Sequence, residues 1–207
     1  MPNTPEHPTL SPALQAELQR IIEARHHDPF AVLGRHVQGD QATVCAFKPH
    51  VAQLSIGDQR LPMQRLGDSD VFVWQGPADA IPEHYQRHWQ ADGHEASEYD
   101  PYCFAPQLSD FDLHLFGEGR HWHIQQHLGA HPHRVDGIEG VLFATWAPNA
   151  ERVSVIGDFN RWDGRAHPMR VRGGSGVWEL FIPGLGADTL YKFEIRNRES
   201  GEVLVKT

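Results

Sequence analysis

After about residue 30, the chain consists mainly of short runs in which apolar and polar positions alternate. Examples are ATVCAF, VFVWQ, GVLFATW, RVSVI, GVWELFI and YKFEI, which are separated by Gly, Pro, Asn and Asp. Alternation with a period of two is typical of half-buried strands, and many short strands with turns between them favour sandwiches over an α/β domain. The sequence therefore predicts an all-β fold of two tandem β-sandwiches.

One helix is predicted ahead of these strands. Ser11 is a suitable N-cap, and Pro12 suits the first helical position. Four apolar residues then share one helical face: Leu14, Leu18, Ile21 and Ile22. The Asp28-Pro29 pair ends the segment, because a residue before proline disfavours helical backbone.

The order of strand-forming segments occurs twice. Residues 47–56 match residues 146–155 at a constant offset of 99, and residues 71–85 match residues 177–191 at an offset of 106. The second copy therefore carries seven more residues between these blocks. They fall in the region that contains FNRWDGR. We expect one sandwich for each copy.

The repeat predicts three segments: a first sandwich module with its leading helix at 1–106, a linker at 107–136, and a second sandwich at 137–207. The sequence LSDFDLHLFGEGRHWHIQQHLGAHPHRVDG lacks strand alternation. It is predicted to be a linker that holds one short helix, from Gly119 to Leu128.

The second copy is shorter at its end than the first. Gly93 of the first copy aligns with Gly201 of the second, which would place the counterpart of Asp100 at position 208. We therefore expect further protein after Thr207, and we expect the catalytic chemistry to lie there.

The net charge of the chain argues against some classes of binding partner. The chain has 27 acidic and 18 basic residues, with a formal charge of −9. Such a field repels nucleic acid and anionic lipid. We expect neither as a partner, and the charge favours a neutral one.

The only two cysteines are Cys45 and Cys103, and we expect both to be free thiols. The opening MPNTPEHPTL has no signal-peptide pattern, and no run approaches 18 consecutive apolar residues. We therefore expect a cytoplasmic protein.

The common catalytic and metal-binding motifs are missing from the sequence. It contains no G-x-S-x-G, H-E-x-x-H, C-x-x-C or P-loop pattern. A glycosidase pair could in principle come from four acidic residues: Asp110, Asp112, Asp158 and Asp163. A metal site could come from five crowded histidines: His121, His123, His127, His131 and His133. We favour neither, and expect no metal and no cofactor.

The tryptophans divide into two groups. Trp74, Trp146 and Trp178 stand on strand-like runs, and we expect them to pack inward. Trp162 lies instead in a polar turn, beside Asn160 and other groups that can donate or accept hydrogen bonds. It either folds over the sandwich edge or offers a flat apolar ring to a sugar.

The segments GVLFATWAPNAERVSVIGDFNRWDGRAHPMR, SGVWELFIPGL and YKFEI resemble the second N-terminal module of bacterial glycogen branching enzymes. HHDPFAVLGRH and YDPYCFAP resemble the first module of the long bacterial form, and DLHLFGEGRHWHIQQHLGAH resembles its connecting segment. The similarity covers nearly the whole chain. One departure is Gln125, where the family pattern has an aromatic residue.

The resemblance implies an immunoglobulin-like, glycogen-binding sandwich from about Gly137, followed by a (β/α)₈ barrel beyond Thr207. Catalytic groups of such barrels sit on loops at the carboxyl ends of strands, so no catalytic residue is expected in this sequence. The parent would cleave an α-1,4 linkage of a glucan and transfer the chain to a 6-hydroxyl, making the α-1,6 branches of glycogen.

The resemblance also implies a glucan-binding site made of Trp162, Asn160 and Lys192. The expected partners are α-1,4-glucans, namely glycogen and maltooligosaccharides, and the chain's own catalytic barrel. Glucan binding would support chain-length preference. Two alternatives stay open: a module that only braces the barrel, and the N-terminal part of a related debranching or trehalose-forming enzyme.

Overall fold

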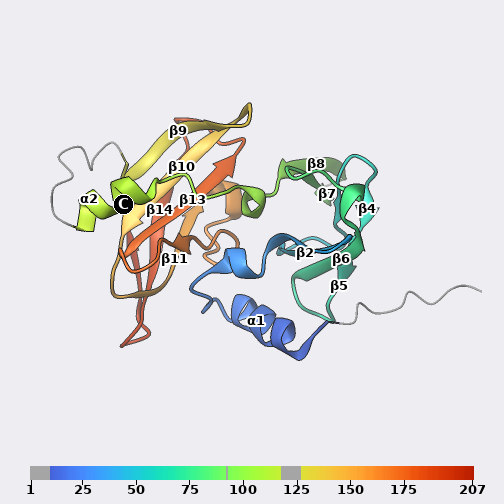
Figure 1. The fold of residues 1–207 in the computed structure, drawn as a ribbon, viewed down its shortest axis with the longest axis horizontal. Helices are drawn as coiled ribbons and strands as arrows, with labels where there is room; N and C mark the ends of the chain where they lie inside the picture. The colour runs from blue at the N-terminus through green and yellow to red at the C-terminus, as the bar shows by residue number, and fades with distance from the viewer. Residues whose placement is uncertain (1–9, 92, 118–126) are drawn as a thin grey trace, which may run out of the picture. The chain divides into compact units, whose positions relative to one another are not determined.

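The computed structural model describes residues 10–91, 93–117 and 127–207, which form two compact units (Figure 1). The first unit holds residues 10–22 and 32–103, and the second holds residues 23–31 together with those from 104 onward. Within the described ranges, no helix is long and apolar enough to cross a membrane.

The first unit is a helix and two antiparallel sheets. Helix α1 spans Pro12–Ile22. One sheet has the strand order β1 (Gly34–Gln38), β2 (Gln41–Phe47), β6 (Val71–Pro77) and β5 (Gln64–Arg65). The other has the order β4 (Leu61–Pro62), β3 (Ser55–Ile56), β7 (Gln86–Ala91) and β8 (His94–Tyr99). Short 3₁₀ turns occupy Ala78–Ala80 and Pro101–Cys103.

Apolar residues from both sheets build the core of the first unit. Its buried members include Val44, Ala46, Leu54, Ile56, Phe72 and Tyr85. Helix α1 forms where it was predicted, because the Ser11 hydroxyl accepts a hydrogen bond from the Leu14 amide at 3.2 Å. Leu18 and Ile21 on its apolar face are buried.

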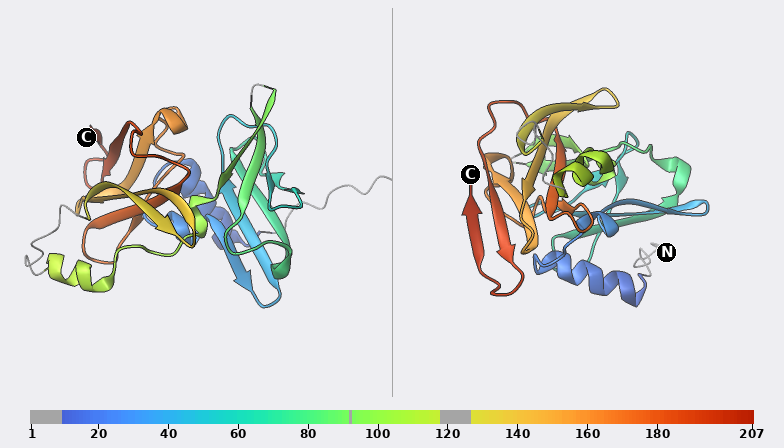
Figure 2. Two further views of the ribbon diagram at one scale, coloured as in Figure 1. Left: turned by 90° about the horizontal axis from the view of Figure 1, so that it is seen from above. Right: turned by 60° about the vertical axis from the view of Figure 1, so that its left-hand side comes forward.

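The second unit also has two antiparallel sheets. One has the order β12 (Arg170–Val171), β13 (Val177–Pro183), β10 (Ile138–Trp146) and β9 (Gly129–Val135). The other has the order β11 (Ala150–Gly157), β14 (Tyr191–Asn197) and β15 (Val203–Lys206). Helix α2 spans Asp110–Gly117, and 3₁₀ turns occupy Pro29–Ala31 and Asp158–Asn160. In the right-hand view of Figure 2, β15 is the outermost red strand, at the open edge of its sheet.

The two sheets of the second unit meet through aromatic and branched side chains. Phe143 of β10 and Tyr191 of β14 make an edge-to-face contact, with ring centroids 4.9 Å apart. Val153, Val155 and Trp178 are buried beside them. The predicted all-β fold of two sandwiches with a short N-terminal helix is thus confirmed.

The internal repeat corresponds to equivalent strands. Strands β6 and β13 begin and end at positions that differ by the same offset of 106, and they pair with β2 and β10 respectively. The additional residues of the second copy lie between β11 and β12, where the first copy has only short strands and turns.

The two compact units differ in two places from the segments 1–106, 107–136 and 137–207 that the sequence predicts. Strand β9 pairs with β10 inside the range 107–136 that was expected to be a linker, so the second sheet begins before residue 137. Residues 23–31 join the second unit, where Arg25 pairs with Glu151 at 3.3 Å and Arg170 lies over the Phe30 ring at 3.2 Å.

The expected linker helix was Gly119–Leu128. Residues 118–126 lie outside the described ones, and residues 127 and 128 are not helical. The helix that the structure describes in this segment is α2, which begins earlier. Ser109 supplies the N-cap for it, because its hydroxyl accepts a hydrogen bond from the Asp112 amide at 3.1 Å.

Candidate functional site

Trp162 lies in a tight turn that follows strand β11. After Gly157 the chain makes a 3₁₀ turn, and then Arg161 and Trp162 both adopt left-handed backbone, with φ of 57° and 60°. The Trp162 amide donates a hydrogen bond to the Gly157 carbonyl oxygen at 2.9 Å. The Trp162 residue is 41 % exposed, so it does not fold into the core.

A hydrogen bond from the indole nitrogen holds the Trp162 side chain in place. Its Nε1–H donates a hydrogen bond to Asp158 Oδ1 at 2.8 Å. This bond satisfies the one polar group of the ring and fixes its orientation while the ring stays at the surface.

Asn160 is part of the turn's internal framework and is only 9 % exposed. Its Oδ1 accepts from the Gly157 amide at 2.9 Å. Its Nδ2 donates to the Val155 carbonyl oxygen at 2.8 Å and to His167 Nδ1 at 2.9 Å. Both amide protons are therefore used inside the protein, and Asn160 does not face solvent as a sugar contact would require. The structure makes it a residue that positions the turn.

Lys192 is exposed and lies beside the same end of β11. It pairs with Ile156 across β11 and β14, and the next pair, Gly157 with Tyr191, adjoins the Trp162 turn. Side chains of paired residues point to one face, so Lys192 stands on the face opposite to buried Phe193.

Leu190 adds an exposed apolar side chain next to Tyr191. A Cβ on Gly157 would collide with the Leu190 carbonyl oxygen, so this close approach requires glycine. Around the Gly157 end of β11 the structure thus has two exposed apolar side chains, Trp162 and Leu190, and the exposed Lys192, which is two residues from Leu190 on β14.

A buried arginine supports the second half of the turn, and sequence reasoning missed it. Arg152 on β11 donates to the Gly164 carbonyl oxygen at 2.7 Å and to Glu194 Oε1 at 2.5 Å. A Cβ on Gly164 would collide with the Glu194 carboxylate. The available signal was a charged residue, Arg152, at the start of the strand-forming run RVSVI.

The acidic residues that could have formed a glycosidase pair have other partners. Asp110 pairs with Arg172 at 3.1 Å, and Asp163 pairs with Arg165 at 2.7 Å. Asp112 accepts from the Ser109 hydroxyl at 2.6 Å. Asp158 holds the Trp162 indole. None of these contacts joins two of the four carboxyl groups, so they give the glycosidase alternative no support.

The histidine cluster is only partly described, since His121 and His123 lie outside the described residues. His131 Nε2 donates to the Leu128 carbonyl oxygen at 2.9 Å, and His133 Nε2 donates to Gln107 Oε1 at 3.0 Å. No group of three or more His, Cys, Asp or Glu side chains in the described part of the chain could hold a metal ion.

Trp74, Trp146 and Trp178 were expected to pack inward, and the structure confirms this for two of them. Trp178 is buried, and Trp74 is partly buried against the core of the first unit. The prediction is wrong for Trp146, which is 54 % exposed. Trp146 is the last residue of β10, and three positions separate it from Phe143, so its side chain lies on the face of β10 that is opposite to the facing sheet.

Both cysteines are free thiols, as expected. Burial raises the pKa of the Cys45 thiol to about 12, with a smaller contribution from Asp100. Burial also raises the pKa of Cys103.

Two family profiles match the chain. Residues 14–102 match "alpha-1,4-glucan branching enzyme GlgB, N-terminal domain", and residues 127–207 match "Carbohydrate-binding module 48 (Isoamylase N-terminal domain)". The second match includes the Trp162 turn and strand β14. Among solved structures, a type I pullulanase from Bacillus subtilis str. 168 aligns over 84 % of this chain and 24 % of its own at 17 % identity, with a TM-score of 0.31 that is too low to support an argument.

Curated proteins named 1,4-alpha-glucan branching enzyme GlgB are much more similar. The one from Methylococcus capsulatus is 56 % identical over 195 residues, covering 94 % of this chain and 26 % of that protein. The one from Cellvibrio japonicus is 55 % identical over 206 residues, covering 94 % and 28 %. The chain thus spans about a quarter of the length of these relatives. These matches take in most of the chain's length. The chain therefore belongs to the 1,4-alpha-glucan branching enzyme family and corresponds to the N-terminal region of its members.

Proposed function

We propose that the second unit binds linear α-glucan on the surface formed by Trp162, Leu190 and Lys192. The observation that supports this most strongly is the exposed indole of Trp162, which Asp158 and a left-handed turn hold at the surface. The turn lies inside the stretch that matches a carbohydrate-binding module.

The chemistry of these side chains suits a sugar chain. A glucose ring has an apolar C–H face that can stack on the Trp162 ring, and the Lys192 ammonium offers three donors to rim hydroxyls. Such a shallow surface replaces well-hydrated hydroxyls with few direct contacts. We therefore expect a Kd near millimolar, about −4 kcal/mol.

We further propose that the parent protein is a 1,4-α-glucan branching enzyme. The relatives that carry this name are about four times longer than the matched region, and no catalytic motif occurs in these 207 residues. The parent would break an α-1,4 bond, form a glycosyl ester on a carboxylate outside this chain, and pass the chain to a 6-hydroxyl. Two free thiols support a cytoplasmic location.

Native electrophoresis in gels that contain glycogen tests glucan binding. The 207-residue chain should be retarded relative to a gel without glycogen, and Trp162→Ala should be retarded clearly less than the wild type. Lys192→Ala should lose part of the retardation. Trp146→Ala, which removes another exposed tryptophan of the same unit, should behave as the wild type. Equal retardation of Trp162→Ala and wild type would refute the proposed surface.

A second candidate function is structural bracing of the rest of the parent. A separate observation favours it: edge strand β15 exposes Val203, Leu204 and Val205, whose side chains alternate between its two faces. Substitutions there that alter branch-chain length in the full parent, with glycogen retardation of the 207-residue chain unchanged, would support bracing.

A further inference from the structure

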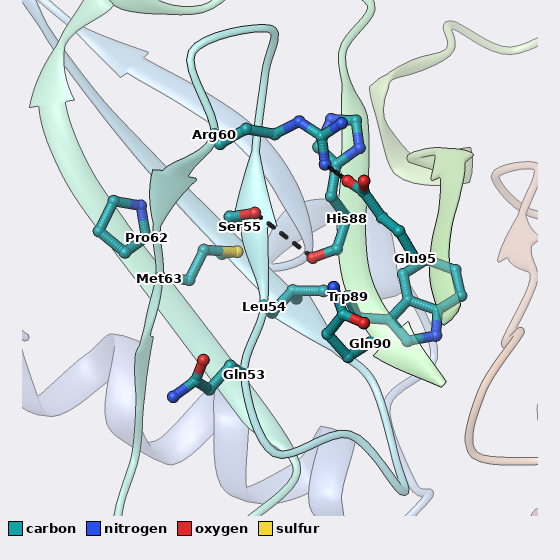
Figure 3. A pocket seen from close by; sticks show the side chains of 10 residues that line it. All are labelled: Gln53, Leu54, Ser55, Arg60, Pro62, Met63, His88, Trp89, Gln90 and Glu95. Atoms are coloured by element: carbon teal, nitrogen blue, oxygen red, sulfur yellow. Dashed lines mark hydrogen bonds and ion pairs between the residues drawn. The ribbon is translucent and has the colours of Figure 1, made fainter. Parts of the chain in front are cut away.

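The first unit contains a hollow that neither the glucan surface of the second unit nor the family matches explain. Its volume is about 440 Å³, within the range of small-molecule sites. It lies along strands β3, β4, β7 and β8, and Figure 3 shows the side chains that line it. Ser55, Pro62, His88 and Gln90 share one face of this sheet, because Ser55 pairs with both Pro62 and His88.

His88 is the feature of this hollow that points to a ligand. It is only 6 % exposed, and both ring nitrogens are closed to solvent without a hydrogen bond of full geometry to the described residues, although the Gly57 backbone lies close enough to the ring to act on its pKa. Buried polar groups without partners are rare, because each costs free energy unless water or a ligand satisfies it. Burial, with the neighbouring Arg60 charge, lowers the pKa of His88, so the ring is neutral at pH 7 and offers one donor and one acceptor.

The charges of the lining cancel. Arg60 and Glu95 form an ion pair with each other across the hollow's upper side in Figure 3. With His88 neutral, the remaining polar groups are amides and a hydroxyl: the exposed Gln53 and Gln90, and Ser55. A lining without net charge has no electrostatic preference for an anion or a cation.

The rest of the lining is apolar. Leu54 and Met63 are buried members of the core that also line the hollow. The half-buried Trp89 lines it as well, and Lys48 Nζ lies 3.8 Å from the centroid of the Trp89 ring. Apolar surface surrounded by neutral donors and acceptors matches a ligand with C–H faces and a rim of hydroxyls.

We propose that this hollow is a second saccharide site, which takes a short α-glucan segment, with Gln53 and Gln90 bonding its hydroxyls and the His88 ring forming part of its wall. The proposal rests on the proposed function only for the choice of glucan as the sugar. Its geometry involves no residue of the Trp162 surface.

The test is a maltoheptaose titration of the 207-residue chain that carries Trp162→Ala, followed by the ¹⁵N resonances of the His88 ring. These signals should shift and approach saturation with a Kd near millimolar. The double variant Gln53→Ala/Gln90→Ala, which changes only exposed side chains, should weaken that response at least about fivefold. Gln38→Ala, an exposed glutamine of the same unit on β1, should leave it unchanged.

Three results would overturn the proposal: no His88 response at ~20 mM sugar, well above the expected Kd, a response to inorganic phosphate but not to maltoheptaose, or equal responses with and without Gln53 and Gln90. The Trp162 surface is tested separately by the glycogen gels. A His88 response together with unaltered retardation of Trp162→Ala would keep this site and refute the other, and the reverse pattern would do the opposite.

Discussion

At the scale of single residues, Trp162 stays exposed because of the backbone just before it. Arg161 and Trp162 are consecutive non-glycine residues in left-handed backbone, which costs roughly 1–2 kcal/mol for each. The hydrogen-bonded framework of Asn160 maintains this turn. Strain of this kind gathers at functional sites, and here it directs an indole toward solvent.

Arg161→Gly should relieve part of this strain. Glycine adopts positive φ without a steric penalty, so the free energy of unfolding should rise by about 1 kcal/mol in urea denaturation. The matched control is Arg20→Gly in helix α1, where the same replacement should lower stability by about 1 kcal/mol because glycine disfavours helix. An unchanged or lower stability for Arg161→Gly would show that the arginine side chain stabilises the turn.

The two thiols should be inert in the folded protein. With a pKa of about 12, Cys45 would be only about one part in 10⁴ thiolate at pH 8, and the thiolate is the reactive form. A colourimetric thiol reagent at pH 8 should therefore find no fast-reacting group in buffer and two in urea. A fast reaction of one group in buffer would mean that Cys103, the less buried thiol, is open to the reagent.

At the scale of elements, strands β7 and β8 are joined to the turn after them by buried charges. Asp100 is fully buried and accepts from the Tyr85 hydroxyl at 2.5 Å and from the Tyr102 amide at 3.1 Å. Buried Arg87 lies 3.6 Å from it and also pairs with Glu98. Burial and then the adjacent Asp100 raise the pKa of Tyr85, so it stays a neutral donor.

Asp100→Asn should be strongly destabilising, because it removes a buried charge opposite Arg87 while nearly keeping its shape. We expect a loss of about 3 kcal/mol in urea denaturation. Glu95→Gln, which makes the same chemical change in the exposed pair with Arg60, should cost under about 1 kcal/mol. Similar small losses in both variants would show that Arg87 is adequately paired by Glu98 alone.

Strand type and order could be predicted from the sequence because alternation reflects burial on one face. The face to which each side chain points could not be predicted: Trp146 was expected to pack inward, but it lies on the face of β10 opposite to Phe143 and is exposed. The amide of Asn160 was a plausible sugar contact by residue type, and only the fold shows that it bonds to Gly157 and Val155 instead. The hollow around His88 joins strands whose pairing no local pattern specifies.

At the scale of the whole molecule, the described chain consists of two sandwiches, and the four acidic residues considered for glycoside transfer each have another partner. The two copies share strand order, but the seven additional residues of the second fall where its glucan surface is proposed. The two copies thus have the same arrangement of strands, and the longer loop after β11 distinguishes the second copy from the first.

The 207-residue chain alone should neither branch nor hydrolyse amylose, because it spans about a quarter of the length of its relatives. Amylose incubated with it should keep its iodine spectrum over time, whereas a full-length relative should shift it. A time-dependent shift that persists after contaminating amylases are removed, and that follows the protein through a further purification step, would contradict this expectation.

The most direct test of the account follows the indole N–H resonance of Trp162 during titration with maltoheptaose, assigned by its loss in Trp162→Phe. The account predicts a progressive shift with a Kd near millimolar, together with a stability of Trp162→Ala within about 1 kcal/mol of wild type, since an exposed ring adds little to the core. A resonance that does not move, combined with a loss of several kcal/mol in Trp162→Ala, would make Trp162 a structural residue and contradict the proposed glucan surface.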